Sequence, residues 1–113
     1  MTKIWRMREI YIDWTRQGRK HCSTRLTKKD LGEKFELVSG SYYKPKKSGV
    51  IVEITSIMMW SQANIGDMMK EIIYKAEGFQ SWEEFINVLL EINKKKNITK
   101  DTYFHTMTYK VIG

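Results

Sequence analysis

The residues of this chain that could do chemistry begin with a group of cations near the N-terminus. Residues 16 to 29 contain no acid, and their cations are Arg16, Arg19, Lys20, Arg25, Lys28 and Lys29. These cations flank or belong to a short segment, 20–26, that also carries Ser and Thr. Like charges repel, so such a group does not stabilise a fold, but it attracts phosphates and releases counterions on binding. The pattern indicates an anion-binding surface, to which Lys44, Lys46 and Lys47 add a second group.

A metal site is the second chemistry to consider, because the chain has two His residues and one Cys. His21 and Cys22 are adjacent, so their side chains would point to opposite faces of a strand. His105 adds one more ligand at best, and structural zinc sites need about four. The sequence therefore predicts no metal site and no cofactor. Glycine-rich nucleotide-binding motifs and the zinc-protease motif HExxH are also absent.

The composition describes the kind of domain that must hold these residues. The chain has 113 residues, 42% hydrophobic and 29% charged, which predicts one globular domain over residues 1–113. Its 20 Lys and Arg against 13 Asp and Glu give a net charge of +7, which favours RNA or DNA as partners. No apolar run approaches the roughly 20 residues of a membrane span, and we find no secretory signal. With Cys22 as the single cysteine, these features predict a cytoplasmic protein that does not bind membranes.

Hydrophobic periodicity predicts the elements of the N-terminal half. Apolar residues three and four apart predict a helix from about Trp5 to Gln17, ended by Gly18. Residues 20–26 are expected to form a short strand with a polar face, and residues 35–37 a second strand. The polar, basic segment 44–49 is expected to be an exposed loop.

The C-terminal half has stronger patterns. Residues 50–60, VIVEITSIMMW, predict a strand in the interior of the sheet, and residues 65–76 predict a helix. The buried stripe of that helix is expected to be Ile65, Met68, Met69, Ile72, Ile73 and Ala76. Ser81 and Glu84 form a capping box that begins another helix. Residues 102–112 alternate, which predicts a closing strand with one face made of Tyr103, His105, Met107, Tyr109 and Val111. The order of elements predicts an α+β domain with a mainly antiparallel sheet.

Several motifs, taken together, resemble the activating signal cointegrator homology (ASCH) domain. They are Gly18-Arg19-Lys20 with Ser23 and Arg25, LGEKFEL at 31–37, VIVEITSI at 50–57, AEGFQSWEEF at 76–85, and a final strand from Tyr103. They follow the family's order over nearly the whole chain. The chain departs from the family's pattern at His21, which replaces a Thr, at Glu33, which replaces an Asp, and at 14–17, which replaces an apolar pair.

The resemblance implies a fold and two kinds of function. The fold is a PUA-like α+β domain, a twisted, partly closed β-barrel with flanking helices and a cleft between barrel and helices. Many members of the family are regarded as RNA-binding modules. Some small stand-alone members hydrolyse the amide of N4-acetylcytidine with a Lys, a Thr or Ser three residues further on, and a Glu before the second helix. Carried to this chain, the implied catalytic set is Lys20, Ser23 and Glu77.

These residue types suit the removal of an acyl group. Ser23 can attack the acyl carbon when a neighbour accepts its proton, and a neutral Lys20 can accept it. Glu77 can deliver a proton to the leaving amine, and Arg25 can orient the substrate or stabilise negative charge. Residues three apart on a strand point to opposite sides, so Lys20 and Ser23 converge only if Lys20 belongs to the turn after Gly18 or if a bulge intervenes.

Several hypotheses remain open at this point. The first is a module that binds RNA or a modified nucleoside in a basic cleft, with ligand contacts from Arg19, His21, Arg25 and Trp60, the last as a wall of the pocket. Its nucleic-acid contacts would come from Arg16, Arg19, Lys28, Lys29, Lys46 and Lys47. The second is a metal-independent amidohydrolase acting on N4-acetylcytidine, and a third is a regulator whose basic face covers DNA phosphates. The alternative without catalysis is that Lys20 is a phosphate-binding or solvated Lys, Ser23 is a strand hydroxyl, and Glu77 is a helix-end acid or a salt-bridge partner.

Overall fold

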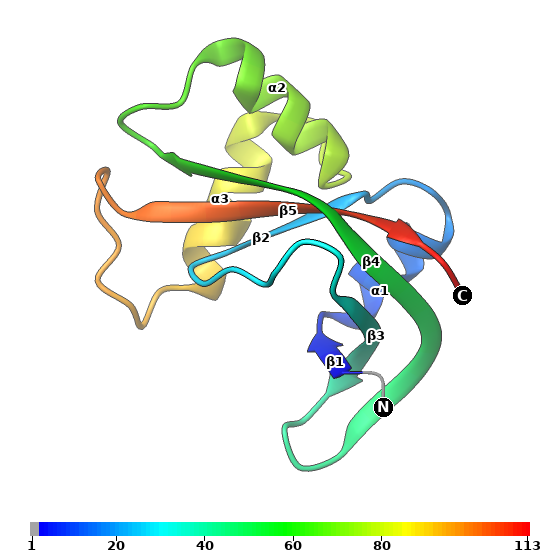
Figure 1. Ribbon diagram of the computed structural model, residues 1–113. Helices are drawn as coiled ribbons and strands as arrows, with labels where there is room; N and C mark the ends of the chain where they lie inside the picture. Colours follow the sequence, from blue (N-terminus) through cyan, green and yellow to red (C-terminus); the bar gives the residue numbers. More distant parts are fainter. Residues whose placement is uncertain (1–2) are drawn as a thin grey trace.

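Five strands and three helices make up residues 3–113, the part of the chain that the computed structural model describes (Figure 1). In chain order they are β1 (Lys3–Arg6), α1 (Glu9–Arg16), β2 (Cys22–Arg25), β3 (Lys34–Gly40), β4 (Pro45–Ser61), α2 (Asp67–Ala76), α3 (Trp82–Ile92) and β5 (Tyr103–Val111). The strands form one mixed sheet in the order β1-β3-β4-β5-β2. β1 and β3 are parallel, and the other neighbours are antiparallel. The predicted α+β class is confirmed.

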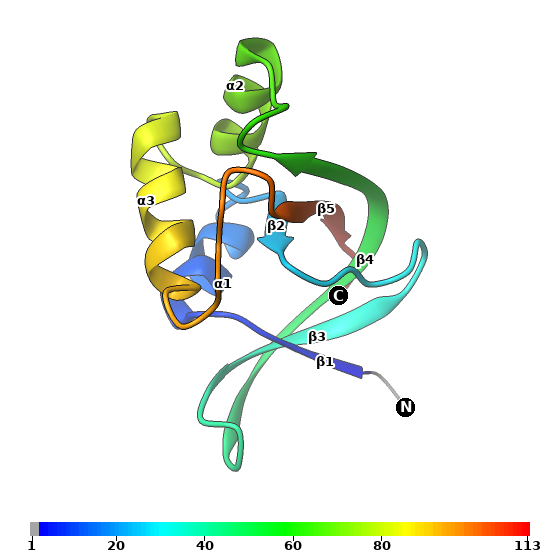
Figure 2. The ribbon, with the colours of Figure 1, turned by 90° about the vertical axis from the view of Figure 1, so that its left-hand side faces the viewer.

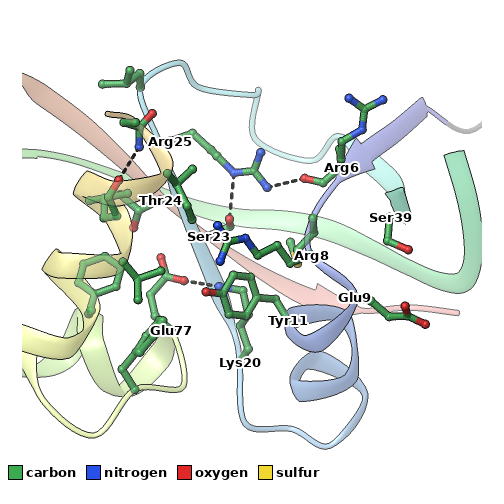
Figure 3. A pocket seen from close by; sticks show the side chains of 18 of the residues that line it. Arg6, Arg8, Glu9, Tyr11, Lys20, Ser23, Thr24, Arg25, Ser39 and Glu77 are labelled. Atoms are coloured by element: carbon green, nitrogen blue, oxygen red, sulfur yellow. Dashed lines mark hydrogen bonds and ion pairs between the residues drawn. The ribbon is translucent and has the colours of Figure 1, made fainter. Parts of the chain in front are cut away.

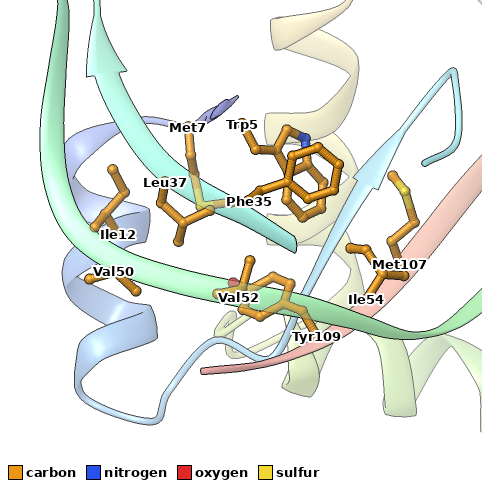
Figure 4. Close-up of a cluster of buried hydrophobic side chains, with 10 residues drawn as sticks. All are labelled: Trp5, Met7, Ile12, Phe35, Leu37, Val50, Val52, Ile54, Met107 and Tyr109. Carbon is orange, nitrogen blue, oxygen red and sulfur yellow. The ribbon is translucent and has the colours of Figure 1, made fainter. Parts of the chain in front are cut away.

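The long strand β4 connects two hydrophobic clusters on opposite faces of the sheet. The first cluster consists of Trp5, Met7, Ile12, Phe35, Leu37, Val50, Val52, Ile54, Met107 and Tyr109 (Figure 4). The second consists of Trp60, Ile73, Phe79, Phe85, Leu89 and Phe104. The pairing of β4 with β5 shifts register between Ile54 and Ser56. Ile54 then lies opposite Tyr109 and Trp60 opposite Phe104, so the shift turns Ile54 and Trp60 to different faces.

The sheet is not closed into a barrel, so this part of the predicted fold is wrong. β1 and β2 are the two edge strands, and no main-chain ladder within residues 3–113 joins them (Figure 2). A side chain spans the gap instead. Arg25 of β2 donates from Nη2 to the carbonyl oxygen of Arg6 on β1 at 2.7 Å, and its guanidinium lies 5.1 Å from the ring centre of Trp5.

The N-terminal segment differs from the predicted helix over 5–17. Residues 3–6 are strand β1, and the helix begins only at Glu9. Trp5 and Met7 are both buried, two residues apart, which is the period of a strand that packs one face on the core. Gly18 follows the helix as predicted and has a φ of 76°, a left-handed conformation that glycine adopts without strain.

Two further predictions need correction. The segment 44–49 is not a loop, because β4 begins at Pro45 and pairs with β3 from that residue. In α2 only Ile73 is buried, whereas Met68 and Ile72 are exposed. In β5 the predicted alternation is observed, with Met107 and Tyr109 on one face, and the buried residues Phe104 and Thr106 add a second packed face because β5 lies between β4 and β2 with a cluster on each side.

The other predicted elements are confirmed. Strands occupy 22–25 and 34–40, and β4 lies in the interior of the sheet. The helix α3 begins after Ser81, whose hydroxyl accepts from the amide of Glu84 at 3.1 Å. None of the three helices is both long and apolar enough to cross a membrane.

Candidate functional site

A cavity of about 580 Å³ lies along the edge strand β2 and reaches α1 on one side and α3 on the other (Figure 3). Its volume is in the range of sites that bind small organic molecules. Its polar wall includes Lys20, Ser23, Arg25 and Glu77, and its apolar wall comes from Leu26, Phe79, Phe85, Val88, Leu89 and Ile92. The cavity therefore offers charge on one side and a hydrophobic surface on the other.

Two glycine-containing turns place Lys20 and Glu77 on the polar wall. Lys20 lies two residues before β2, and its amide donates to the carbonyl of Trp14 at 3.1 Å. Glu77 ends α2 and is followed by Gly78 at φ 91°. A Cβ at Gly78 would lie 2.9 Å from Cε3 of Trp14, which is too close. The turn therefore needs glycine, both for its positive φ and because no side chain fits beside Trp14.

Lys20 and Glu77 form a buried ion pair. The side chains are only 4% exposed each, and Lys20 Nζ hydrogen-bonds Glu77 Oε1. Lys20 Nζ also lies 5.2 Å from the ring centre of Tyr11, whose pKa is raised, chiefly by burial. Desolvating two charges is expensive, so a buried ion pair is weak evidence for stability and marks a functional-site candidate when it lines a cavity.

Ser23 lies on the same wall, held by Arg25. The Nε of Arg25 donates to Ser23 Oγ at 3.1 Å, so the serine hydroxyl hydrogen is free to point elsewhere. Among the described residues, Arg25 rather than Lys20 is the hydrogen-bond partner of Ser23. Burial lowers the pKa of Arg25, whose guanidinium is still charged at neutral pH. Because Lys20 lies in the turn after Gly18, outside β2, it reaches the same cavity as Ser23.

Three of the predicted ligand contacts lie elsewhere. Trp60 is in the second cluster, where its Nε1 donates to Thr106 Oγ1 at 2.8 Å, so it is not a pocket wall. Arg19 stacks on Trp14 at 3.7 Å and donates to the carbonyl of Gly78 at 2.8 Å. The side chain of His21 is exposed outside the cavity, although its main chain bonds Ala76 and Tyr109.

The cations predicted to contact nucleic acid are mostly outside the cavity. Of the six, only Lys46 lines it, and it is paired with Glu9 at 2.8 Å. Arg16 donates to Asp13 at 2.8 Å and to the carbonyl of Ser48 at 2.7 Å. Lys28 and Lys47 are exposed, Lys29 is half-buried, and Arg19 packs on Trp14 as described.

Several cavity residues were not among the predicted site residues. Arg6, Arg8, Tyr11, Thr24 and Ser39 all line the cavity. Tyr11 lies within the helix predicted from about Trp5 to Gln17, and the polar face predicted for 20–26 was the one signal that pointed to Thr24. No group of three His, Cys, Asp or Glu side chains within residues 3–113 could hold a metal ion.

Comparisons with known proteins identify the class of fold. No family model matches the sequence, and no curated protein matches it. A solved structure of protein EF3133 from Enterococcus faecalis V583, a DUF984 protein, superposes with a TM-score of 0.74 at 14% identity, over 99% of this chain and 81% of that one. The hypothetical protein PH0355 gives 0.68 at 17% identity, over 99% and 100%.

The third solved structure is an ASCH domain from Lactobacillus crispatus JV V101. It superposes with a TM-score of 0.61 at 17% identity, over 90% of this chain and 70% of that one. The resemblance to the ASCH domain is therefore confirmed at the level of the fold. An ASCH-like α+β fold with an open sheet positions the cavity.

Proposed function

We propose that this domain binds a single modified nucleoside in the cavity along β2. The observation that carries the proposal is one cavity of about 580 Å³ with a hydrophobic wall on α3 and buried charged groups opposite. A nucleobase has apolar faces and polar edges, so it matches such a pair of walls. The ASCH-like fold supports a ligand of this class, and the pairing of Arg16 and Lys46 with acids weakens the case for an open groove that tracks a polymer.

The binding proposal can be tested by calorimetric titration with N4-acetylcytidine, cytidine and a single-stranded RNA oligomer at several salt concentrations. We expect saturable nucleoside binding that changes little with salt, because the charges of the cavity are buried. Polymer binding would instead weaken steeply as salt rises. The control is the double variant Lys28→Gln, Lys47→Gln, which removes exposed cations and leaves nucleoside affinity unchanged. If neither N4-acetylcytidine nor cytidine binds, the proposal is refuted.

A second candidate function is hydrolysis of an N4-acylated cytidine, favoured by the placement of Lys20, Ser23 and Glu77 on one wall. In the proposed route a proton moves from the Lys20 ammonium to the Glu77 carboxylate, and the neutral amine of Lys20 then accepts the proton of Ser23. Ser23 Oγ then bonds the acyl carbon. The acyl C–N bond breaks as Glu77 returns its proton to the leaving amine, which releases cytidine. Water then hydrolyses the acyl-serine: its oxygen bonds the acyl carbon, the bond from Ser23 Oγ to that carbon breaks, Oγ takes one of the water's protons, and the acyl group leaves as a carboxylic acid.

This activity is tested by chromatography of N4-acetylcytidine incubated with the protein. Ser23→Ala is expected to abolish cytidine release and to retain binding. Ser39→Ala is the matched control, because Ser39 is another buried serine on the same cavity but lies on β3, away from the ion pair. If the unaltered protein releases no cytidine above the uncatalysed rate, the hydrolase proposal fails and the binding proposal stands on its own test.

A further inference from the structure

The free edge of strand β2 faces the cavity. β2 is an edge strand that pairs with β5 alone, so one side of its main chain has no neighbouring strand. Four consecutive residues, Ser23–Leu26, line the cavity. Side chains alternate along a strand, so a cavity that contacts Ser23, Thr24 and Arg25 in succession runs along the strand's edge, and it continues past the end of β2 to Leu26.

The register shows which main-chain groups point into this edge. The amide of Tyr109 donates to the carbonyl of His21 at 2.9 Å, which is one of the two bonds of a hydrogen-bonded position in the antiparallel ladder, while the amide of His21 donates to Ala76 at 2.7 Å. The pairing continues in register through Cys22–Thr108 to Arg25–His105. Hydrogen-bonded pairs alternate, so Ser23 and Arg25 direct their N–H and C=O groups to β5, and Thr24 directs its own away from β5.

Thr24 is therefore a buried residue whose two main-chain groups face the cavity edge. It is only 6% exposed, the register leaves its N–H and C=O out of the ladder with β5, and outside the strand ladders no main-chain group within residues 3–113 hydrogen-bonds them. Buried main-chain polar groups nearly always have a partner, so a bound ligand is the natural source of one.

The side chain of Thr24 is fixed on the face of the sheet and does not compete for this edge. The indole N–H of Trp60 donates to Thr106 Oγ1, and that oxygen lies 2.8 Å from Thr24 Oγ1. An indole nitrogen is a donor only, so Thr106 accepts from Trp60 and its own hydrogen is available for Thr24. This chain of hydrogen bonds holds β2 against the core and gives the edge a fixed position.

We propose that the main chain of Thr24 recognises the ligand through a pair of hydrogen bonds, in which its N–H donates to the ligand and its C=O accepts from it. The inference rests on the proposed nucleoside binding and narrows the ligand class to planar rings that carry an acceptor beside a donor. The Watson–Crick edge of cytosine, with N3 beside the N4 amino group, is such an edge. Enzymes that act on a single extruded base read it through the same edge.

Amide hydrogen exchange of the unaltered protein, measured by NMR with and without N4-acetylcytidine, tests this inference. Without the nucleoside, the Thr24 amide should exchange faster than the amides of Ser23 and Arg25, which are bonded to β5 and serve as internal controls. At saturation, the exchange of Thr24 should slow at least tenfold. The inference is overturned if Thr24 is already as protected as its neighbours, or if bound nucleoside leaves its exchange unchanged.

A pair of variants provides a second measurement. Thr24→Pro deletes the N–H at the free edge but breaks no bond to β5, and an edge strand tolerates proline at such a position. Thr24→Val, the control, deletes only the side-chain hydroxyl. Nucleoside affinity should be about tenfold lower for Thr24→Pro than for Thr24→Val, the loss of one hydrogen bond. Equal affinities contradict the inference. If Thr24→Pro does not fold, the exchange experiment decides.

If no nucleoside binds the unaltered protein, the proposed function and the inference both fail. Nucleoside binding without protection of the Thr24 amide refutes the inference alone.

Discussion

Two Lys–Glu pairs line the same cavity, and they differ in their access to water. Lys20 and Glu77 are 4% exposed each, whereas the side chains of Lys46 and Glu9 are 68% and 62% exposed. In the outer pair, the hydrogen bond at 2.8 Å raises the pKa of Lys46 and lowers that of Glu9. Solvent screens that interaction, so an exposed pair of this kind contributes little to stability.

The two pairs differ in the free energy needed to remove their charges from water, which is large only for the buried pair. Transferring Lys20 and Glu77 out of water requires several kcal/mol per ion, which their mutual attraction only partly offsets. Two apolar side chains of similar size would stabilise the fold as well or better. The buried pair is therefore better explained by a task at the cavity than by stability, and the outer pair needs no such explanation.

The largest expected effect comes from breaking the inner pair. Glu77→Gln leaves the charge of Lys20 buried without its partner, so the free energy of unfolding should fall by about 3–5 kcal/mol. The same change at Glu9 should alter it by less than about 0.5 kcal/mol. Urea denaturation of both variants measures the difference. Equal losses at the two positions would show that burial does not distinguish the pairs.

Removing both inner charges should separate stability from function. The double variant Lys20→Met, Glu77→Leu fills the same space without ions, so its free energy of unfolding should be within about 1 kcal/mol of the unaltered protein or above it. Its nucleoside affinity should be lost. Denaturation and calorimetry on one preparation test both parts, and retention of full affinity would show that the pair has no role in binding.

The buried thiol of Cys22, close to the inner pair, also predicts how the free energy of unfolding changes at alkaline pH. Burial, together with the charge of Glu77, raises the pKa of the Cys22 thiol well above its ordinary value. The unfolded chain then releases this proton first, from about pH 8.5, so stability should fall as pH rises, by up to about 1.4 kcal/mol per pH unit. Cys22→Ala should have a flatter profile between about pH 8.5 and 10. A profile identical to that of the unaltered protein would contradict the assigned cause. Above that range Tyr109, whose pKa is also raised by burial, should add a further decline.

The smallest expected effect concerns the outer pair. A double-mutant cycle with Lys46→Gln and Glu9→Gln should give a coupling free energy of about 0.2–1 kcal/mol, and 1 M salt should reduce it further. An outer coupling as large and as salt-resistant as expected for buried charges would remove the distinction between the two pairs.

Local patterns predicted much of this fold, and the failures share a cause. β2, β4 and α3 were predicted because their periodicity or capping is visible within a few residues. β1 was missed because Trp5 packs through a parallel pairing with β3, a partner some thirty residues away. Trp60 was placed in the pocket because nothing in the sequence reveals the register shift that turns it into the second cluster.

The candidate site shows the same division. Lys20, Ser23 and Glu77 were named through a family resemblance, and the structure brings them to one cavity. Thr24 was not named, because its importance depends on β2 being an edge strand beside β5, which is a property of the strand order. The sequence therefore indicated side chains that could take part in chemistry. It did not indicate the free main-chain edge of β2, because main-chain groups at a free edge leave no signal in the amino-acid composition.

The most direct test of the central proposal is to fill the cavity from its apolar wall. Val88 lines the cavity and its neighbour Asn87 is exposed outside it, so Val88→Trp and Asn87→Trp add the same bulk to adjacent positions of α3. Calorimetric titration with N4-acetylcytidine should show binding weakened at least tenfold in Val88→Trp and unchanged in Asn87→Trp, with both variants folded by circular dichroism. Full affinity in folded Val88→Trp would contradict the proposal that the nucleoside lies between α3 and the Lys20–Glu77 pair.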